Sequence, residues 1–600
     1  MQEGFHRTAG GWDVVALILA LLQATWPPAI PEDSAESLRR AARSAERRYE
    51  YLLRRLAPIR YGGGYSGRCD EIVGRFCLIY EGGDPPKVDP PPPEILRARQ
   101  DVVDALRRAF AGLPGDLDTA GPLLRYLIED GRADEALSAA LTFAWATADS
   151  VWGDLLLGYA YHATANDSAA ERSFDAALAR MSAEDRRRFE SIEVFLSGRE
   201  RSLYRKLSPE ERAVYETQFW RLADPLYLLE GNERRAEHFA RHVWGRLLSI
   251  TPRVTGVHSW GRDLEELTLR YGVPTSRERV VSQYLHQPDS YVEHYPPDQL
   301  TFEPAALRTE GIGDAPPPGE SWPLEPKWAR SGYAPGSVRR LVPVDHQVVR
   351  FPAGDSVALR IYGQMPLDSA AERATRVRAG LFLLDVNYAP AGERRGAAEL
   401  RDSIAFAALE FRVAPGRYVY SFELLEEASR LAGRSRYGVD VPGYPRTGVA
   451  LSDPVLAEPF RGGALPSSRD DAVLRPLARL VFEEGDTVGL YAEAHGLQTG
   501  PDGATRYAVE LSVVKVDEPS LLARAARWLG RQLGLTRDPG VPRLSWEGQG
   551  EGGRAAVLAV DLPLTELDPG LHELELTVTD LVGGGQFTTR RLLRIGASSL

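Results

Sequence analysis

Two histidines spaced by one helical turn are the first side chains in this chain that could hold a metal ion. His238 and His242 follow Glu237 in the order Glu-His-x-x-x-His, and imidazoles four residues apart on a helix can bind one ion together. The glutamate precedes the pair, whereas in the HExxH motif of metalloproteases it lies between the histidines. A third ligand is not evident nearby in the sequence. We therefore predict no metal site and expect these histidines at the surface or at an interface.

A glycine-rich stretch and a pair of cysteines lie close together near the N-terminus. Gly62-x-Gly64-x-x-Gly67 has the spacing of a dinucleotide-binding fingerprint, but a genuine one follows a strand and opens a helix. A predicted helix precedes this stretch and the cysteines follow it, so we predict no dinucleotide. Cys69 and Cys77 are too few for a zinc site, which needs about four ligands. We predict that they form a disulfide in an oxidising compartment, with two buried thiols as the alternative.

Motifs of the common enzyme classes are not found in the sequence. It contains no nucleophile elbow, phosphate-binding loop or kinase motif set. Carboxylates are abundant, so a pair for glycoside hydrolysis stays open, but no short segment isolates one. These observations weaken the case for an enzyme without closing it, and we predict no catalytic residues and no cofactor.

The overall composition is that of a folded protein of several domains. The apolar fraction is 43% and the charged fraction 26%, both ordinary for globular chains, and 600 residues predict roughly three to five domains. The formal net charge of −12 is spread over the chain. A nucleic-acid partner is not expected, because such proteins usually show a concentrated basic face.

The N-terminus resembles an export signal. Residues 14–22 form a nine-residue apolar run that follows Arg7, which is the length of a signal-peptide core and too short to span a bilayer. We predict a signal peptide over residues 1–26 and a periplasmic or extracellular location. A buried first helix is the alternative, because Asp13 adjoins the run and no Ala-x-Ala site follows it. No other segment predicts an integral membrane span.

Helical periodicity dominates the N-terminal half, up to about Ile250. An amphipathic helix is predicted over residues 34–56, followed by a proline-rich spacer over 84–93. Further on, like residues recur at an interval of 34, namely Leu123 and Leu157, Leu127 and Tyr161, Ala136 and Ala170, and Ala140 and Phe174. These offsets resemble the tetratricopeptide repeat of paired helices; an ordinary helical bundle is the alternative.

Strand patterns dominate the C-terminal half, after a proline- and glycine-rich linker over residues 311–337. Two sets of landmarks parallel each other: a Gly-Asp turn follows Phe351 and Phe482, and a Pro-Gly turn occurs at Pro415 and Pro569. We predict two immunoglobulin-like β-sandwiches in tandem. The fold class is thus α+β and multidomain, with an α-helical repeat half and a tandem β-sandwich half.

The most specific text lies between residues 215 and 275. It contains Phe219-Trp220, Ala223-Asp224-Pro225 and Asn232-Glu233, then Ser259-Trp260-Gly261-Arg262-Asp263 and Tyr271-Gly272. This text resembles the bacterial GWxTD-domain proteins, although Ser259 and Arg262 replace the glycine and threonine of the namesake motif. The resemblance implies a signal peptide and a β-rich C-terminal half, and it implies no established activity. The predicted domains are 27–93 (a helical segment with the cysteine pair), 94–214 (helical repeats), 215–310 (GWxTD-like), 338–446 (first sandwich) and 447–600 (second sandwich, with an inserted helix over 521–533).

The GWxTD-like residues have two interpretations. In the structural one, Trp260 packs in a small core, Asp263 caps a helix over 264–270, and Tyr271-Gly272 ends that helix. In the functional one, Trp260, Arg262, Asp263 and Tyr271 line a groove for a ligand or partner.

We expect a non-catalytic interaction or scaffold protein of the bacterial cell envelope with a protein partner. One alternative is an envelope hydrolase with its site near the GWxTD-like segment. The other is a surface protein whose sandwiches bind a carbohydrate or another ligand. The sequence does not indicate an oligomeric state.

Overall fold

The computed structural model describes residues 32–61, 69–79, 87–250, 258–281, 290–295, 331–367, 376–516, 543–565 and 567–596. The predicted signal peptide, the glycine-rich stretch at 62–67, most of the 311–337 linker and the inserted helix over 521–533 lie outside these residues. The chain divides into two units. Unit 1 comprises the described residues of Met1–Leu196, Arg235–Gln299 and Lys327–Ala334, and unit 2 those of Ser197–Arg234, Leu300–Pro326 and Pro335–Leu600. The segment predicted as the GWxTD-like domain is therefore divided between the units.

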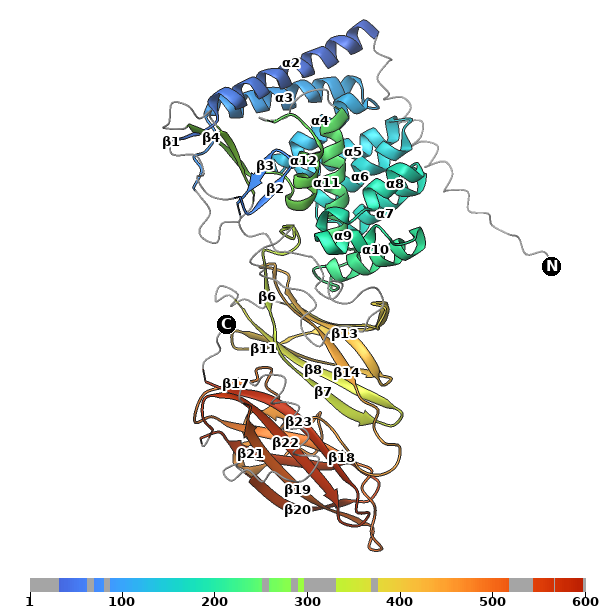
Figure 1. Cartoon of the computed structure of the whole chain (residues 1–600), viewed down its shortest axis with the longest axis vertical. Coiled ribbons are helices and arrows are strands. Elements are labelled where there is room, and N and C mark those ends of the chain that lie inside the picture. The colour runs from blue at the N-terminus through green and yellow to red at the C-terminus, as the bar shows by residue number, and fades with distance from the viewer. Residues whose placement is uncertain are drawn as a thin grey trace, which may run out of the picture. The chain divides into compact units, whose positions relative to one another are not determined.

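Unit 1 is mainly helical (Figure 1). Its helices are α2 (Glu32–Leu56), α3 (Pro93–Gly112), α4 (Leu117–Glu129), α5 (Ala133–Ala146), α6 (Ser150–Ala163), α7 (Asp167–Arg180), α8 (Ala183–Glu190), most of α11 (Glu233–Ile250) and α12 (Arg262–Tyr271). Its short strands are β1 (Ile59–Tyr61), β2 (Glu71–Val73), β3 (Phe76–Leu78), β4 (Ser276–Val281) and β5 (Ser290–His294). The predicted helical character up to Ile250 is confirmed.

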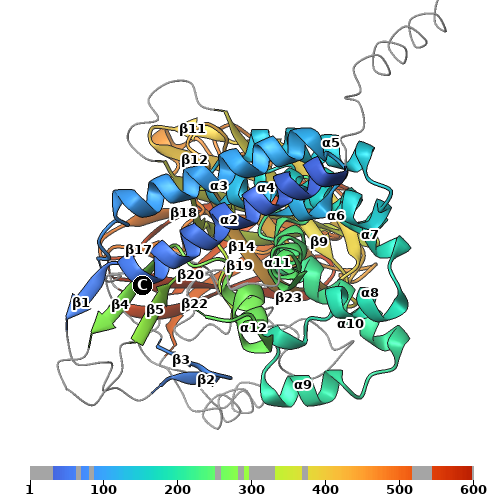
Figure 2. The same ribbon diagram turned by 90° about the horizontal axis from the view of Figure 1, so that it is seen from above.

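The residues that recur at the predicted interval of 34 belong to two successive helix pairs, α4 with α5 and α6 with α7. Six of the eight are at most 2% exposed and lie in one apolar core, namely Leu123, Leu127, Ala136, Ala140, Ala170 and Phe174. Gly158 of α6 permits the close approach of α7, since a Cβ atom there would lie 2.6 Å from the ring of Phe174. The long helices α2 and α3 lie side by side and extend this core (Figure 2).

Unit 2 begins with helices α9 (Gly198–Tyr204) and α10 (Pro209–Ala223) and continues with two β-sheets in the region predicted as the first sandwich. These strands are β6 (Arg340–Pro343), β7 (Asp345–Ala353), β8 (Ser356–Pro366), β9 (Val377–Leu384), β10 (Pro390–Ala397), β11 (Glu399–Arg401), β12 (Ile404–Val413), β13 (Gly416–Glu426) and β14 (Leu431–Val441). One sheet has the order β10-β9-β13-β14-β6 and the other β11-β12-β8-β7.

The region predicted as the second sandwich has one sheet of closely related topology. Its strands are β15 (Ala450–Leu451), β16 (Val455–Ala457), β17 (Val481–Phe482), β18 (Thr487–His495), β19 (Ala504–Lys515), β20 (Arg543–Glu551), β21 (Ala556–Pro563), β22 (Gly570–Asp580) and β23 (Gln586–Ile595). The sheet order β17-β23-β22-β19-β20 matches the order β6-β14-β13-β9-β10 of the first region. In each of these sheets the strand that comes first in the chain (β6 or β17) pairs in parallel with the strand that comes last (β14 or β23). In the other sheet, β18 pairs with β15, β16 and β21.

Candidate functional site

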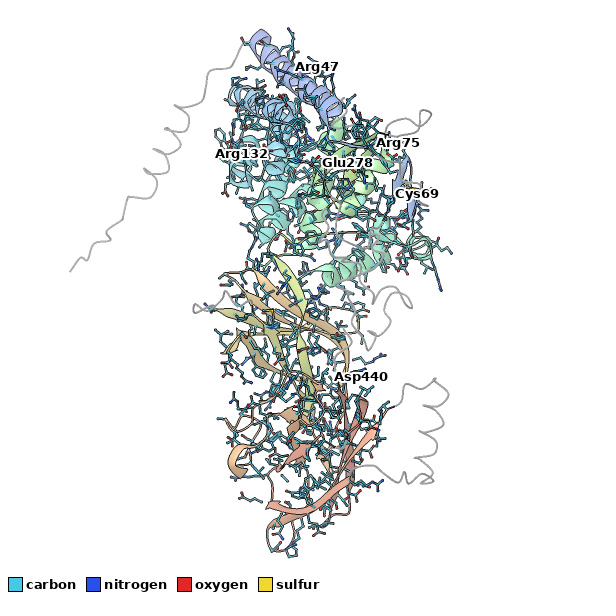
Figure 3. The ribbon with its side chains drawn as sticks, turned by 90° about the vertical axis from the view of Figure 1, so that its left-hand side faces the viewer. Arg47, Cys69, Arg75, Arg132, Glu278 and Asp440 are labelled. Carbon is cyan, nitrogen blue, oxygen red and sulfur yellow. A yellow bond between two sulfur atoms is a disulfide. The ribbon has the colours of Figure 1, made fainter. Side chains whose placement is uncertain are left out.

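A disulfide-closed hairpin packs beside the GWxTD-like residues. Strands β2 and β3 pair in antiparallel register, and Cys69 and Cys77 form a disulfide with their Cα atoms 5.3 Å apart. Cys69 and Arg75 of this hairpin are marked in Figure 3. The hairpin therefore presents its turn, which carries Arg75, as a rigid unit to the start of α12.

Arg75 binds the carboxylate of Asp263 in the GWxTD-like segment. Its Nε and Nη2 atoms donate to the two carboxylate oxygens of Asp263 at 2.6 and 2.8 Å, and its backbone N–H adds a third bond at 3.2 Å. The remaining guanidinium contacts are to the Oγ and backbone oxygen of Ser259, at 2.9 and 2.8 Å. The Arg75 hydrogen bonds hold the pKa of Asp263 well below its usual range. The carboxylate is thus ionised and fully bonded, which suits an anchor better than an acid catalyst.

In a second two-bond ion pair the arginine comes from α12 and the carboxylate from the hairpin. The fully buried guanidinium of Arg270 on α12 donates to both oxygens of Glu71 on β2, at 2.6 and 2.9 Å. It also donates to Glu266, at 3.3 Å, and to the hydroxyl of Tyr271, at 2.9 Å. We call the two forks, Arg75 with Asp263 and Arg270 with Glu71, the hairpin clasp.

The turn of the hairpin requires glycine. Gly74 has a φ of +53°, and a Cβ atom there would lie 2.6 Å from the Cβ of Asp263. Any side chain would therefore push the hairpin off α12 as well as strain the backbone.

The structure places the four predicted groove residues around α12. Trp260 packs against Gly245 and lies 6.0 Å from the ring of Trp244, while Arg262 is exposed. Tyr271 is nearly buried, with its ring 5.6 Å from that of Tyr295. A groove at these residues stays a prediction.

The ends of α12 differ in part from the expectation. The helix begins at Arg262 with Gly261 at the N-cap, so the prediction that Asp263 caps it was wrong. Asp263 lies in the first turn, where its charge is favourable to the helix dipole. Gly272, with a φ of +80°, ends the helix as predicted.

The two histidines of the Glu-His-x-x-x-His stretch are buried, so the expectation of surface or interface positions was wrong. His238 Nε2 lies 2.9 Å from the backbone oxygen of Phe189, and the ring of His242 stacks on Phe189 at 4.8 Å. Burial, assisted by Arg188 and Arg246, lowers the pKa of His242 to about 3. No cluster of three or more potential metal ligands occurs among the described residues.

Glu237 belongs to a charge network that the sequence did not indicate. His162 lies between two carboxylates, with Nδ1 2.8 Å from Asp167 and Nε2 2.7 Å from Glu237. Burial alone would lower the pKa of His162, but the hydrogen bonds to both carboxylates raise it to about 10. Burial opposes ionisation of Glu237, yet Arg241 and His162 lower its pKa to about 2. Because both ring nitrogens are bonded to carboxylates, His162 is not available as a proton shuttle.

The segment that begins with Asp224-Pro225 connects helix α10 to the first sandwich within unit 2. Arg436 and Glu423, both fully buried, form an ion pair at 3.3 Å. Arg436 also donates to the backbone oxygens of Leu222 and Asp224 at 2.9 and 3.0 Å, and Glu423 accepts from the backbone N–H of Leu228 at 2.9 Å. The segment after α10 is thus bonded to the sheet through its backbone.

Described residues of unit 2 line at least two cavities, and no sequence motif indicated either of them. One, of about 340 Å³, is lined by His346, Arg350, Tyr420, Tyr437 and Asp440, among others. The other, of about 330 Å³, is lined chiefly by three arginines and two aromatic rings from β8, β11, β12 and the segment 469–476. Their residues come from strands far apart in the chain, so no local motif marks them.

Comparisons with known proteins give no family. No family model matches the chain, and no curated protein does. A solved structure of β-glucuronidase 2 from Bacteroides uniformis is similar to 40% of this chain and 26% of its own, with 10% identity and a TM-score of 0.15. The α-2-macroglobulin of Escherichia coli is similar to 45% of this chain and 24% of its own, with 12% identity and a TM-score of 0.13. The chain therefore spans about a quarter of the length of these proteins, and likenesses at such TM-scores carry no argument about fold or function.

Among the helices that the structure describes, none is both long enough and apolar enough to cross a membrane.

Proposed function

We propose that this protein is an exported, non-catalytic scaffold that resembles the GWxTD-domain proteins. In this proposal the helix pairs α4–α5 and α6–α7 act as tetratricopeptide-like repeats, and the two sandwiches are immunoglobulin-like modules. The helical unit binds a protein partner, and the sandwiches form a stiff support.

The observation that carries the proposal is the apolar core that the two sandwiches share. Phe351, Tyr362 and Phe406 of the first sandwich are buried together with Val455, Leu474 and Tyr491 of the second sandwich and the segment leading into it. A shared core of this kind resists bending between modules, which a spacer needs and two independently tethered domains lack.

Hydrogen bonds reinforce this junction. The side-chain amide of Gln347 donates to the backbone oxygen of Leu456 at 2.8 Å and accepts from its N–H at 3.1 Å. Arg350 forms a fork with Asp453, at 2.6 and 3.1 Å. Both contacts tie β7 of the first sandwich to the residues that begin the second.

The state of the ionisable groups also favours a scaffold over the alternative of an envelope hydrolase. Asp263 accepts four hydrogen bonds, three from Arg75 and one from the backbone of Leu264. His162 is bonded to a carboxylate at each nitrogen. Neither group is free to act as an acid or base near neutral pH.

Helix α5 offers a surface for the partner. Leu141 and Trp145 lie one turn apart, 49% and 66% exposed, and apolar side chains paired at this spacing suit helix or peptide recognition. The test is capture of crosslinked partners by the full-length chain in the cells that produce it. Leu141→Asp should reduce recovery of a stoichiometric partner about tenfold or more, whereas Val214→Asp, at an equally exposed position on α10 (51%), should not. Equal recovery with both variants would contradict the partner-binding role.

The proposed location has its own test. The disulfide between Cys69 and Cys77 is consistent with an oxidising compartment. Mass spectrometry of the native chain should find an N-terminus near Thr25 and a mass that shows the disulfide. An intact Met1 with two free thiols would contradict export.

A further inference from the structure

The cavity at the face of β8 and β12 that packs on the second sandwich contains polar groups that form no hydrogen bond within the described part of the chain. It has a volume of about 330 Å³, at the lower end of the range for small-molecule sites. Its chief lining residues are Arg360, Tyr362, Arg401, Phe406, Arg469 and Leu474. Arg360 and Tyr362 are two residues apart on β8 and so project from the same face of the sheet.

Two buried hydrogen-bond donors of the lining residues lack a partner among the described residues. Tyr362 is 1% exposed, and its hydroxyl is buried without a hydrogen bond. The Nε–H of Arg360 is buried in the same state. A buried donor without a partner is costly to the fold, and this cost is accounted for if the two donors serve a bound molecule.

The hydroxyl of Tyr362 is suited to donate. Burial raises the pKa of Tyr362 to about 12, so the phenol keeps its proton throughout the physiological range. Across the sheet, Tyr362 lies opposite Ala408, whose small side chain leaves the cavity open at this point.

The cavity is lined by three arginines and by the three carboxylates of Glu399, Asp470 and Asp471. The side chains of Arg360, Arg401 and Arg469 are 16%, 25% and 18% exposed. The carboxylates of Asp470 and Glu399 are more exposed, at 72% and 67%, so water screens them.

The carboxylate of Glu410, near two of these arginines, is only loosely paired. Glu410 lies 3.7 Å from Arg360 and 3.5 Å from Arg469, longer than an ordinary charged hydrogen bond. Arg360 also lies 2.8 Å from Asp470, and Arg469 lies 3.5 Å from Glu493. The Nε–H of Arg360 is therefore the donor that keeps capacity for an anion.

We propose that this cavity binds a small organic carboxylate. One carboxylate oxygen accepts from the Arg360 Nε–H and the other from the Tyr362 hydroxyl, and the body of the ligand packs against Leu474 and Pro476. A planar carboxylate suits an arginine donor, and the apolar lining favours an organic acid over an inorganic anion. This binding role is independent of the partner-binding role of the helical unit.

The test is titration of the full-length chain with acetate, succinate and benzoate, with benzamide as the uncharged analogue and inorganic phosphate as the alternative anion. At least one carboxylate should bind saturably, and Tyr362→Phe should weaken it about tenfold or more, because one charge-assisted hydrogen bond is lost. Tyr507→Phe, at another buried strand tyrosine, should leave the affinity unchanged. Benzamide should bind at least tenfold more weakly than benzoate if benzoate is the ligand.

Thermal unfolding of both variants separates binding from folding. Tyr362→Phe should melt at or above the temperature of the wild type, because its hydroxyl has no hydrogen bond to lose. The proposal is overturned if no carboxylate binds saturably, if phosphate binds more tightly than every carboxylate, or if Tyr362→Phe binds as the wild type does.

Discussion

The hairpin clasp and the β8–β12 cavity are both built from arginines, carboxylates and aromatic rings, yet they differ in how completely their polar groups are bonded. In the clasp, the carboxylates of Asp263 and Glu71 are each held by an arginine fork. In the cavity, the Tyr362 hydroxyl and the Arg360 Nε–H are buried without a bond among the described residues. A closed network stabilises structure, whereas an open one keeps the capacity to bind something else. From this contrast we infer that the GWxTD-like residues around Asp263 stabilise the fold, whereas the cavity binds a ligand.

The largest expected effect is at the buried half of the clasp. Glu71→Ala removes the carboxylate that accepts two bonds from the fully buried Arg270, which keeps its contact with Glu266. Complete unpairing of a buried charge typically costs about 3–5 kcal/mol, so this partial loss should lie near the lower end. The free energy of unfolding of unit 1, from urea titration, should fall toward that range. Glu393→Ala, which removes a partner from the exposed Arg395 pair, should change it by less than about 0.5 kcal/mol. A small effect of Glu71→Ala would mean that the clasp is not a closed network.

The disulfide should contribute somewhat less. Closing the eight-residue separation between Cys69 and Cys77 should stabilise the hairpin by about 2–3 kcal/mol through the entropy of the unfolded chain. Unfolding of the double variant Cys69→Ser, Cys77→Ser, compared with the oxidised wild type, measures this term. The cavity should keep its carboxylate affinity in the same variant, since it lies in unit 2. Loss of both properties together would show that the two regions are not independent.

A pH effect should come from the closed network at His162. The pKa of His162 is raised to about 10 in the folded state, from an ordinary value of about 6.5. Its contribution to stability is therefore fully present below pH about 6.5 and is lost as the pH rises through about 10. The difference in unfolding free energy between the wild type and His162→Gln should shrink steadily across that window. A constant difference would contradict the charged state assigned to this imidazole.

The exposed half of the clasp should give the smallest change. Arg75 is about half exposed (48%), so water weakens its ion pair with Asp263. Asp263→Asn should lower the unfolding free energy of unit 1 by much less than Glu71→Ala does, with Arg262→Gln at the exposed neighbouring position as the control. A much larger loss would indicate a role for Asp263 beyond its bond to Arg75.

The sequence predicted those helices and strands in which the buried positions are apolar and the exposed positions are polar. Helix α2 and strands such as β12 and β23 follow their apolar periodicity closely. Strands β10, β14 and β20 lack such a pattern. β10 and β20 are largely exposed edge strands, and β14 buries Arg434 and Arg436, whose polar character conceals a central strand.

The site was harder to predict than the fold, for a physical reason. The motif with Trp260 and Asp263 could be recognised because its residues are close in sequence. Arg75, which binds Asp263, lies 188 residues away from it. The cavity residues come from four segments between Arg360 and Pro476. Only the pairing of β8 with β12 and the path of the chain before the second sandwich bring them together.

One paired measurement tests the contrast between clasp and cavity most directly: melting temperature and carboxylate affinity, determined together for Glu71→Ala and Tyr362→Phe. The account predicts that Glu71→Ala melts several degrees lower with unchanged affinity, while Tyr362→Phe keeps its melting temperature and loses affinity about tenfold. The reverse pattern, or a loss of both properties in both variants, would contradict the assignment of the clasp to structure and the cavity to binding.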